Sequence, residues 1–350
     1  MRVVLDVTPL SWNGGGLQRF TAGLHKALAK VNADLDLWRW SGSQPSSTAA
    51  FDGTTGVYHH PANGPRDRHF AGIPQGWSLV TTIHDVIPTT LASNGSDLQY
   101  RFEMGSLLRR ADAIATVSFA AKADLIRYYS IAGDDITVIY PGIQRFAAES
   151  REVARMKLSW LRLPREAPIV ICVGLDRGYK NLRGALEAFA IAARTCGDAI
   201  FVIAGYHPAQ DVTRWMIRAH ALGVASRVVF AGRVSDGDLG HLYRTASVLI
   251  HLSEAEGLGM PPLEAVLCGV PCVLSDLAVF HETLGNLATY VPGDDPHAAG
   301  KAIITAIDRG LVGAVSTCAA RFTWRRCAET YVSFYKSIMA RQHGAGGLQR

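Results

Sequence analysis

The stretch from residue 246 to residue 271 places the tightest constraint on the fold, because it passes from a strand through a glycine-rich turn into a helix. Residues 246–252 form an apolar run that suits a buried strand and is too short for an ordinary helix. Pro261 and Pro262 follow the turn. Proline is tolerated in the first turn of a helix, where its missing N–H would have had no partner. The stretch therefore predicts a strand–turn–helix unit.

The N-terminus of this helix is predicted to bind an anion, most simply a phosphate. Free N–H groups and a partial positive charge favour an anion there. Gly257 and Gly259 remove the side chains that would keep a ligand away from the backbone. Glu256 and Glu264 bracket the turn, and carboxylates are unsuited to binding phosphate directly. We interpret these two residues as ligands for hydroxyl groups.

Strands alternate with helices on both sides of a linker predicted near residues 145–152. The expected strands are 3–7, 79–83, 114–117, 136–139, 168–174, 199–204, 227–230 and 246–252. The expected helices are 17–30, 97–112, 181–195, 211–222 and 236–245. This order predicts two α/β domains with parallel sheets and a ligand in the cleft between them. Residues 41–76, rich in Ser, Gly, Pro and His, predict no regular element.

Composition narrows the class of protein. At 350 residues the chain exceeds the usual size of a single core, so two domains are expected. Its six cysteines include no Cys-x-x-Cys pair and indicate a reduced, cytoplasmic protein. We expect no signal peptide and no span of roughly 20 apolar residues that would cross a bilayer. The net charge of +5 suits phosphorylated ligands, and no basic, aromatic-interleaved stripe indicates nucleic acid.

Other candidate residues lie where strands end, and each has a structural alternative. Gly14, Gly15 and Gly16 form either a phosphate- or sugar-binding turn or merely a sharp turn into a helix, since the dinucleotide fingerprint is absent. His84 and Asp85 end a strand, where α/β sheets bind ligands, but they could equally be a strand-end histidine and a helix cap.

The charged residues around the later helices can likewise be interpreted either as ligand-binding residues or as structural ones. Lys180, just ahead of a helix, adds a full positive charge that should reach the predicted phosphate, and Asn181 could cap that helix. Asp236 and Asp238 resemble a metal motif, but Ser235 before them favours helix capping. The basic, amphipathic helix 97–112 faces a membrane or an acidic acceptor, or is simply a solvated face.

Taken together, these motifs resemble the GT-B glycosyltransferases, specifically the large retaining family four, over nearly the whole chain. The most specific match is the Glu-x7-Glu motif from Glu256 to Glu264. Supporting matches, in chain order, are residues 14–16, 84–88, 111–118, 138–143, 180–181, 230–234, 242–243 and 322–324. The resemblance implies two facing Rossmann-like domains with an interdomain cleft. Residues 1–148 would form the acceptor-side domain, residues 149–331 the donor domain, and a helix at about 332–345 would pack back on the first.

The resemblance also implies roles for individual residues. Glu264 would hold the ribose hydroxyls of the nucleotide, and Glu256 those of the donor sugar, with His84 beside the transferring sugar. The predicted catalytic residues are therefore His84 and Glu256. The other predicted donor-binding residues are Gly15, Gly16, Arg177, Lys180, Arg233, Val234, Gly257, Leu258, Gly259 and Met260.

Two departures from the family pattern affect the predicted cations and the turn. Leu175 stands where many members carry an arginine or a threonine, and Tyr179 stands where many carry an arginine. Either Arg177 therefore substitutes for the missing cation, or Lys180 acts more alone. Leu258 replaces the more usual phenylalanine, which should matter little because the backbone binds the ligand.

The predicted reaction is metal-independent, cofactor-free transfer of a hexosyl unit, with retention, from a nucleoside-diphosphate sugar to an acceptor hydroxyl. GDP-mannose is the expected donor and a polyprenyl-diphosphate-linked saccharide of surface polysaccharide or O-antigen synthesis the expected acceptor. The enzyme would be cytoplasmic, with possible peripheral contact at the inner face of the membrane. The alternatives are a UDP-dependent glucosyl- or N-acetylglucosaminyltransferase, a nucleotide-sugar epimerase, a dinucleotide-dependent oxidoreductase and a non-catalytic sugar-nucleotide binder.

Overall fold

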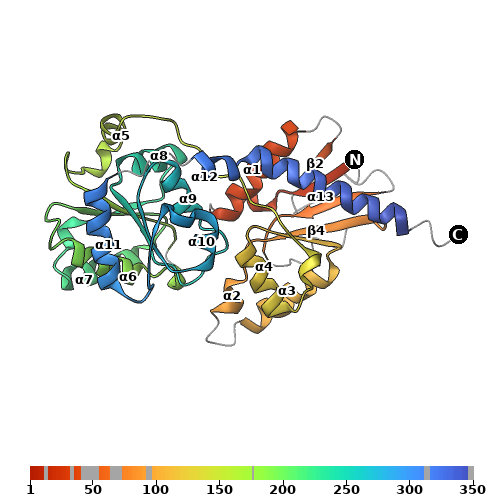
Figure 1. Ribbon diagram of the computed structural model, residues 1–350, viewed down its shortest axis with the longest axis horizontal. Helices are drawn as coiled ribbons and strands as arrows, with labels where there is room; N and C mark the ends of the chain where they lie inside the picture. The colour runs from red at the N-terminus through yellow and green to blue at the C-terminus, as the bar shows by residue number, and fades with distance from the viewer. Residues whose placement is uncertain are drawn as a thin grey trace. The chain divides into compact units, whose positions relative to one another are not determined.

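The computed structural model describes residues 1–11, 15–31, 35–40, 55–63, 73–91, 97–175, 177–310 and 316–345. Gly14 of the predicted glycine loop and most of residues 41–76 lie outside these ranges. The chain divides into two compact units, the first formed by Met1–Ile143 with Ala320–Arg350 and the second by Gln144–Ala319 (Figure 1). The chain thus returns to the first unit at residue 320, earlier than the boundary predicted at 331.

The first unit is built on a six-stranded sheet in which every neighbouring pair of strands is parallel. Its strands are β1 (Arg2–Asp6), β2 (Asp36–Trp40), β3 (Gly56–His60), β4 (Trp77–Ile83), β5 (Ala113–Thr116) and β6 (Ile136–Val138). They lie in the order β2-β1-β3-β4-β5-β6. The connection after β1 leads to β2 on one side, and the connection after β3 leads to β4 on the other side. The position between β1 and β3 is therefore a topological switch point.

Helices cover both faces of this first sheet (Figure 1). They are α1 (Gly16–Val31), α2 (Ile87–Thr90), α3 (Asp97–Arg110), α4 (Phe119–Tyr129) and α13 (Trp324–Ala345). Side chains of α1 and α13 share one apolar cluster with strand residues such as Leu5 and Val80. Side chains of α3 and α4 share another with Val4 and Ile83, which point the opposite way. This alternation is what a strand buried on both faces requires.

The second unit repeats the design with the order β12-β11-β10-β7-β8-β9, again parallel throughout. Its strands are β7 (Ile169–Val173), β8 (Ile200–Ala204), β9 (Val228–Gly232), β10 (Val248–His251), β11 (Cys272–Ser275) and β12 (Thr289–Val291). In chain order within the unit this is the 3-2-1-4-5-6 arrangement of the Rossmann fold. Its switch point lies between β7 and β10.

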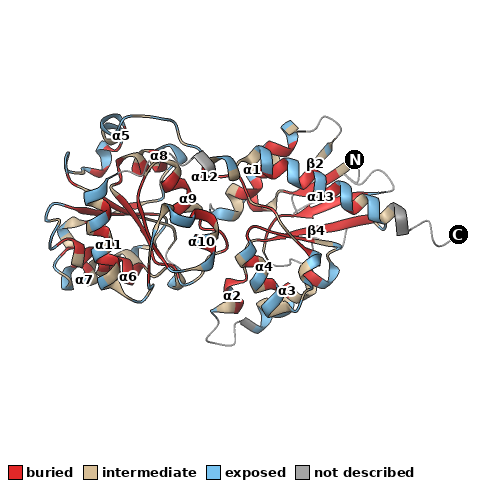
Figure 2. Cartoon of the chain, in the orientation of Figure 1, coloured by how far each residue is buried: buried red, intermediate tan, exposed pale blue. Residues whose placement is uncertain are grey.

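The helices of the second unit also form two layers, and the strands between them are buried (Figure 2). Helices α6 (Leu182–Ala192), α7 (Ala209–Ala221) and α11 (Pro296–Arg309) share an apolar cluster with β7, β8, β10 and β11. Helix α8 (Asp236–Thr245) packs on β7, and α9 (Met260–Leu267) packs on β10 and β11. The remaining helices are α5 (Arg151–Lys157), α10 (Ala278–Leu284) and α12 (Ser316–Arg321).

The predicted α/β class with two parallel sheets is confirmed, but strands β2, β3, β11 and β12 were not predicted. Strand β3 lies between β1 and β4, inside the stretch 41–76 that predicts no regular element. All five of its residues are buried, including His59 and His60. The expectation failed because a strand ending in two histidines does not look apolar, and their partners come from distant parts of the chain.

None of the helices in the described ranges is long and apolar enough to cross a membrane.

Candidate donor-binding site

The turn before α9 has the backbone geometry predicted from its glycines and prolines. Gly259 is the N-cap of the helix with φ +83°, a left-handed conformation that favours glycine. A Cβ at this position would lie 2.5 Å from Cε1 of Phe280, so only glycine fits. Proline occupies the first turn and no side chain caps the helix. Pro261 and Pro262 carry no N–H, so the backbone donors at this end of α9 are the N–H groups of Gly259 and Met260, next to the positive dipole end that attracts an anion.

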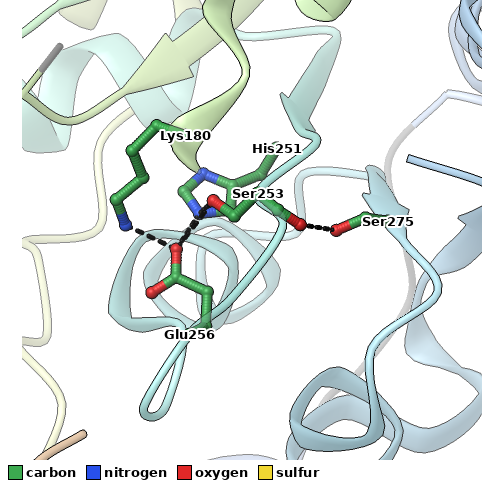
Figure 3. Close-up of polar contacts among 5 residues, drawn as sticks. All are labelled: Lys180, His251, Ser253, Glu256 and Ser275. Carbon is green, nitrogen blue, oxygen red and sulfur yellow. Dashed lines mark hydrogen bonds and ion pairs between the residues drawn. The ribbon is translucent and has the colours of Figure 1, made fainter. Parts of the chain in front are cut away.

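Glu256, in the same turn, is held by three side chains that converge on its Oε1 atom (Figure 3). Lys180 Nζ lies 2.5 Å away in an ion pair. His251 Nε2 lies 2.6 Å away, and the Ser253 hydroxyl donates to the same oxygen at 2.9 Å. Lys180, predicted to reach the diphosphate, therefore pairs with Glu256.

The electrostatics of this group follow from burial and from the neighbouring ammonium. Burial by itself would raise the pKa of Glu256, but the Lys180 charge and the hydrogen bond from His251 lower that pKa to about 2. Burial lowers the pKa of His251 from its usual value, and the Glu256 carboxylate opposes that shift. At neutral pH Glu256 is therefore an ionised carboxylate whose charge Lys180 balances.

The switch point of the second sheet explains why these residues meet. Lys180 ends a short 3-10 turn, η6 (Gly178–Lys180), in the connection after β7, whereas Glu256 follows β10. These two strands are neighbours whose connections run in opposite directions, the position at which open α/β sheets bind ligands. A hydrogen bond from the Glu254 N–H to the Tyr179 carbonyl, 2.7 Å long, ties the two connections together.

Asn181, directly after Lys180, performs the capping role predicted for it. It adopts a left-handed conformation at φ 49°, and its Oδ1 accepts a hydrogen bond from the Gly184 N–H at 2.9 Å. Its amide also donates to the Gly293 carbonyl at 2.8 Å. Asn181 thereby fixes the end of the turn that carries Lys180.

Glu264 lies in the first turns of α9 and is fully buried. The hydroxyl of Tyr243, itself buried on α8, donates to Glu264 Oε2 at 2.9 Å. This contact joins α8 to α9. A role for Glu264 in holding ribose hydroxyls stays a prediction.

The other residues predicted for the donor domain lie on three connections of the second unit. Gly257 and Leu258 are buried in the turn before α9, and Met260 is half-buried at the start of that helix. Arg177 is exposed on the connection after β7. The remaining two, exposed Arg233 and half-buried Val234, follow β9.

The residues predicted on the acceptor side lie in the first unit. The side chain of His84, just after β4, donates through Nε2 to the Pro61 carbonyl at 3.0 Å and meets the edge of Phe20 at a ring distance of 4.5 Å. Burial lowers the pKa of His84 to about 4, so the imidazole is neutral at neutral pH. Gly15, with φ +105°, and Gly16 are exposed where the chain enters α1.

Ser235 caps its helix as the structural alternative predicts, whereas Asp85 lies one residue ahead of Val86, the N-cap of α2. Asp85 Oδ1 accepts a hydrogen bond from the Ile87 N–H at 3.2 Å, at the start of α2. The Asp238 N–H donates to the Ser235 hydroxyl at 3.0 Å, which makes Ser235 the N-cap of α8. The capping interpretation of Ser235 is therefore confirmed.

Sequence reasoning missed three residues of this site: His251, Ser253 and Tyr243. His251 and Ser253 sit at the end of β10, five and three residues before Glu256, and a polar pair closing an apolar strand was the available signal. Tyr243 had no comparable signal, because it meets Glu264 only once α8 and α9 are packed.

A cavity of about 660 Å³ opens near the N-terminal ends of α6 and α7. Its lining is a mixture of charged, polar and apolar side chains: Gly178, Asn181, Leu182, Arg183, Asp211, Arg214, Trp215 and Glu254. It contains none of the predicted site residues, although Gly178 and Glu254 adjoin the segments that carry Lys180 and Glu256. The candidate site is thus defined by those two side chains and the start of α9, not by this cavity.

Two family models match the chain, one for each unit. Residues 160–312 match the model described as glycosyl transferases group 1, and residues 58–145 match the model described as glycosyltransferase family 4. The two matched ranges carry most of the candidate residues, including Lys180, Glu256 and His84.

Two relatives are similar to the chain in sequence, and one solved structure is similar to it in fold. O-antigen chain mannosyltransferase B of Escherichia coli is 26% identical, with 74% of this chain and 70% of that protein covered. O-antigen chain mannosyltransferase RfbU of Salmonella typhimurium is also 26% identical. That match covers 66% of this chain and 61% of RfbU, which is less than two thirds of RfbU. The structure of sucrose-phosphate synthase from Thermosynechococcus elongatus superposes with a TM-score of 0.70 at 17% identity, over 98% of both chains.

Proposed function

Since the chain is a glycosyltransferase of the family-four type with a GT-B fold, we propose that it transfers a mannosyl unit from GDP-mannose to an acceptor hydroxyl with retention of configuration. The choice of mannose is supported by the two relatives named as O-antigen mannosyltransferases. The acceptor we propose is a saccharide carried on a polyprenyl diphosphate. The observation that carries the proposal is the pairing of Lys180 with Glu256 in the turn that leads into α9.

The chemistry needs a stabilised diphosphate leaving group. The backbone N–H groups of Gly259 and Met260, the dipole of α9 and the Lys180 ammonium supply positive potential where negative charge develops, and they do so without a metal or cofactor. On the same face of the sugar, the departing phosphate oxygen takes the acceptor's proton. A front-face displacement of this kind retains the anomeric configuration and requires no strong protein base.

The carboxylates and the first-unit residues are assigned to binding. Glu256 would accept hydrogen bonds from the donor sugar, and Glu264 from the ribose. His84, neutral at physiological pH, would position the transferring sugar rather than remove a proton. The backbone of Gly15 and Gly16 would contact the diphosphate, and backbone groups at 233–234 the nucleobase.

Ligand-induced stabilisation tests the donor first. A ligand present at about 100 times its Kd raises the free energy of unfolding by roughly 2.7 kcal/mol, so a panel of GDP-, UDP- and ADP-sugars can be ranked by the rise in Tm. We expect GDP-mannose to give the largest rise. A UDP-sugar in first place would favour the UDP-dependent transferase, and conversion of the sugar without any acceptor would favour the epimerase.

The site assignment has its own test. His84→Ala and Glu256→Ala should each lower turnover at saturating donor, by about 100-fold or more for Glu256, because each loses a contact to the transferring sugar. Wild-type turnover in both variants would refute the assignment.

We further propose that the first unit makes a transient contact with the inner face of the cytoplasmic membrane. Leu98 and Phe102 lie one turn apart on α3 and are 71% and 73% exposed. Arg101 lies between them on the same helix, and apolar side chains next to a basic one suit an anionic lipid surface.

Sedimentation with vesicles of phosphatidylglycerol at low salt tests this contact. The double variant Leu98→Ser with Phe102→Ser should lose binding to these vesicles while still binding the donor. Ile217→Ser, on α7 and 66% exposed in the wild type, is the matched control and should bind like the wild type. Failure of the wild-type protein to sediment with these vesicles would refute the proposal.

A further inference from the structure

Of the three side chains that contact Glu256, one is flexible and two are fixed in place. Lys180 has a long flexible side chain that is 20% exposed, and it reaches Glu256 from the connection after β7. His251 is the last residue of β10 and Ser253 lies two residues after it, and both are buried. A lysine can turn to another anion by rotating its side chain, whereas these two buried residues cannot.

His251 and Ser253 are held in place from behind. The edge of the Phe280 ring packs against His251 at a centroid distance of 5.8 Å. The Ser253 carbonyl accepts a hydrogen bond from the Ser275 hydroxyl at 2.5 Å, which anchors it to β11 (Figure 3). Both side chains therefore present their donors to Glu256 from a rigid frame.

The two carboxylate oxygens of Glu256 are used unequally. All three contacts go to Oε1, and no hydrogen bond from the described residues reaches Oε2. The side chain is 9% exposed. Oε1 is thus the held end of the carboxylate and Oε2 is the end available to a ligand.

We propose that the Lys180–Glu256 ion pair is an exchangeable contact that the donor's diphosphate breaks, while His251 and Ser253 keep Glu256 charged and oriented after Lys180 has left. In the free protein Lys180 balances the carboxylate. When donor binds, Lys180 moves to the diphosphate and Oε2 accepts the sugar hydroxyl. This inference rests on the proposed function, and it makes His251 a positioning residue that does not itself touch the substrate.

The exchange predicts that Glu256 weakens the binding of a bare nucleoside diphosphate, because Lys180 must first leave it. Glu256→Gln should therefore tighten GDP binding by about 5-fold, the upper value that one released ion pair supports. In a Lys180→Ala background the same substitution should change the GDP dissociation constant by less than about 2-fold, since the coupling runs through Lys180. Isothermal titration calorimetry with GDP, and in parallel with UDP, measures both effects.

Glu254→Gln is the matched control, because Glu254 is an exposed carboxylate two residues away in the same turn. It should leave nucleotide binding within about 2-fold of the wild type. If Glu256→Gln fails to tighten binding, or tightens it equally without Lys180, the exchange is refuted. If neither GDP nor UDP binds the wild-type protein, the proposed function itself fails, which is a different result.

His251 is tested by separating turnover from nucleotide binding. His251→Ala should lower kcat by about 10-fold or more and leave the GDP dissociation constant nearly unchanged, because His251 orients the residue that holds the sugar. His251→Gln retains an N–H donor near the Nε2 position and should restore most of kcat. Equal losses of kcat and nucleotide binding in His251→Ala, or no rescue by glutamine, would show that the histidine is only structural.

Discussion

At the scale of single residues, Gly259 shows how one backbone conformation creates the candidate anion site. Its positive φ turns the chain into α9, and the Phe280 ring fills the space where a Cβ would stand. Gly237, in the first turn of α8, is a useful contrast. A Cβ there would lie 3.6 Å from the Ser235 hydroxyl oxygen, an ordinary contact.

Gly259→Ala should therefore lower the free energy of unfolding by about 2 kcal/mol or more, through a left-handed backbone and a clash with Phe280. It should also weaken nucleotide binding. Gly237→Ala should stay within about 0.5 kcal/mol of the wild type. Urea unfolding of the two variants measures the difference, and similar stabilities would mean that the turn tolerates a side chain.

Tyr243 allows a second test at the same scale. Tyr243→Phe removes the hydroxyl that donates to Glu264, and loss of a hydrogen bond to a charged group costs about 1.5–3 kcal/mol. Tyr206→Phe is the control, because Tyr206 is 55% exposed. Equal stability of the two variants would show that the Tyr243 hydroxyl does not hold Glu264.

At the scale of elements, the return of α13 onto the first sheet is fixed by a buried polar chain. His59 on β3 contacts the Tyr335 hydroxyl through Nδ1 and the Thr82 hydroxyl through Nε2, both at 2.7 Å. Thr82 on β4 also contacts the Tyr331 hydroxyl at 2.8 Å. Residues from opposite ends of the chain thus satisfy a histidine that would otherwise be costly to bury.

The buried histidines of the first unit predict that its stability depends on pH. Burial lowers the pKa of His59 to about 3 and that of His84 to about 4, both from 6.5. Below pH 6.5 the unfolded state binds protons that the folded state does not, so stability falls as pH falls. Between pH 6.5 and its pKa in the folded state, each histidine lowers the free energy of unfolding by up to about 1.4 kcal/mol for every pH unit.

Hydrogen exchange of peptides from β3 and β4, corrected for the intrinsic rate, should show lower opening free energies at pH 5 than at pH 7. His59→Gln, which cannot titrate, should lose about half of that difference, and His220→Gln, which changes an exposed histidine, should lose none. A pH effect of the same size in all three proteins would contradict this origin.

At the scale of the whole molecule, features set by local sequence could be predicted and those set by packing could not. Ser235 and Asn181 cap their helices as their positions indicate, because capping involves residues only three apart. The strand that contains His59 could not be read in this way. It depends on side chains that the fold brings together from other elements.

The same distinction applies to the candidate site. Glycines, prolines and a lysine at strand ends indicated an anion near α9, and the resemblance to a family supplied roles for the two glutamates. The sequence held no sign that Lys180 pairs with Glu256, because that pairing requires β7 and β10 to be neighbours at a switch point. Strand order is a property of the whole sheet.

The central claim is that Lys180 and the start of α9 bind the diphosphate of a sugar donor, and release of GDP from GDP-mannose tests it most directly. The wild-type protein should release GDP, and Lys180→Ala should release it about 100-fold more slowly, because one stabilising charge on the leaving group is lost. Lys301→Ala, which changes an exposed lysine on α11, should match the wild type. Equal rates in Lys180→Ala and the wild type, or no nucleotide released from any sugar donor, would contradict the claim.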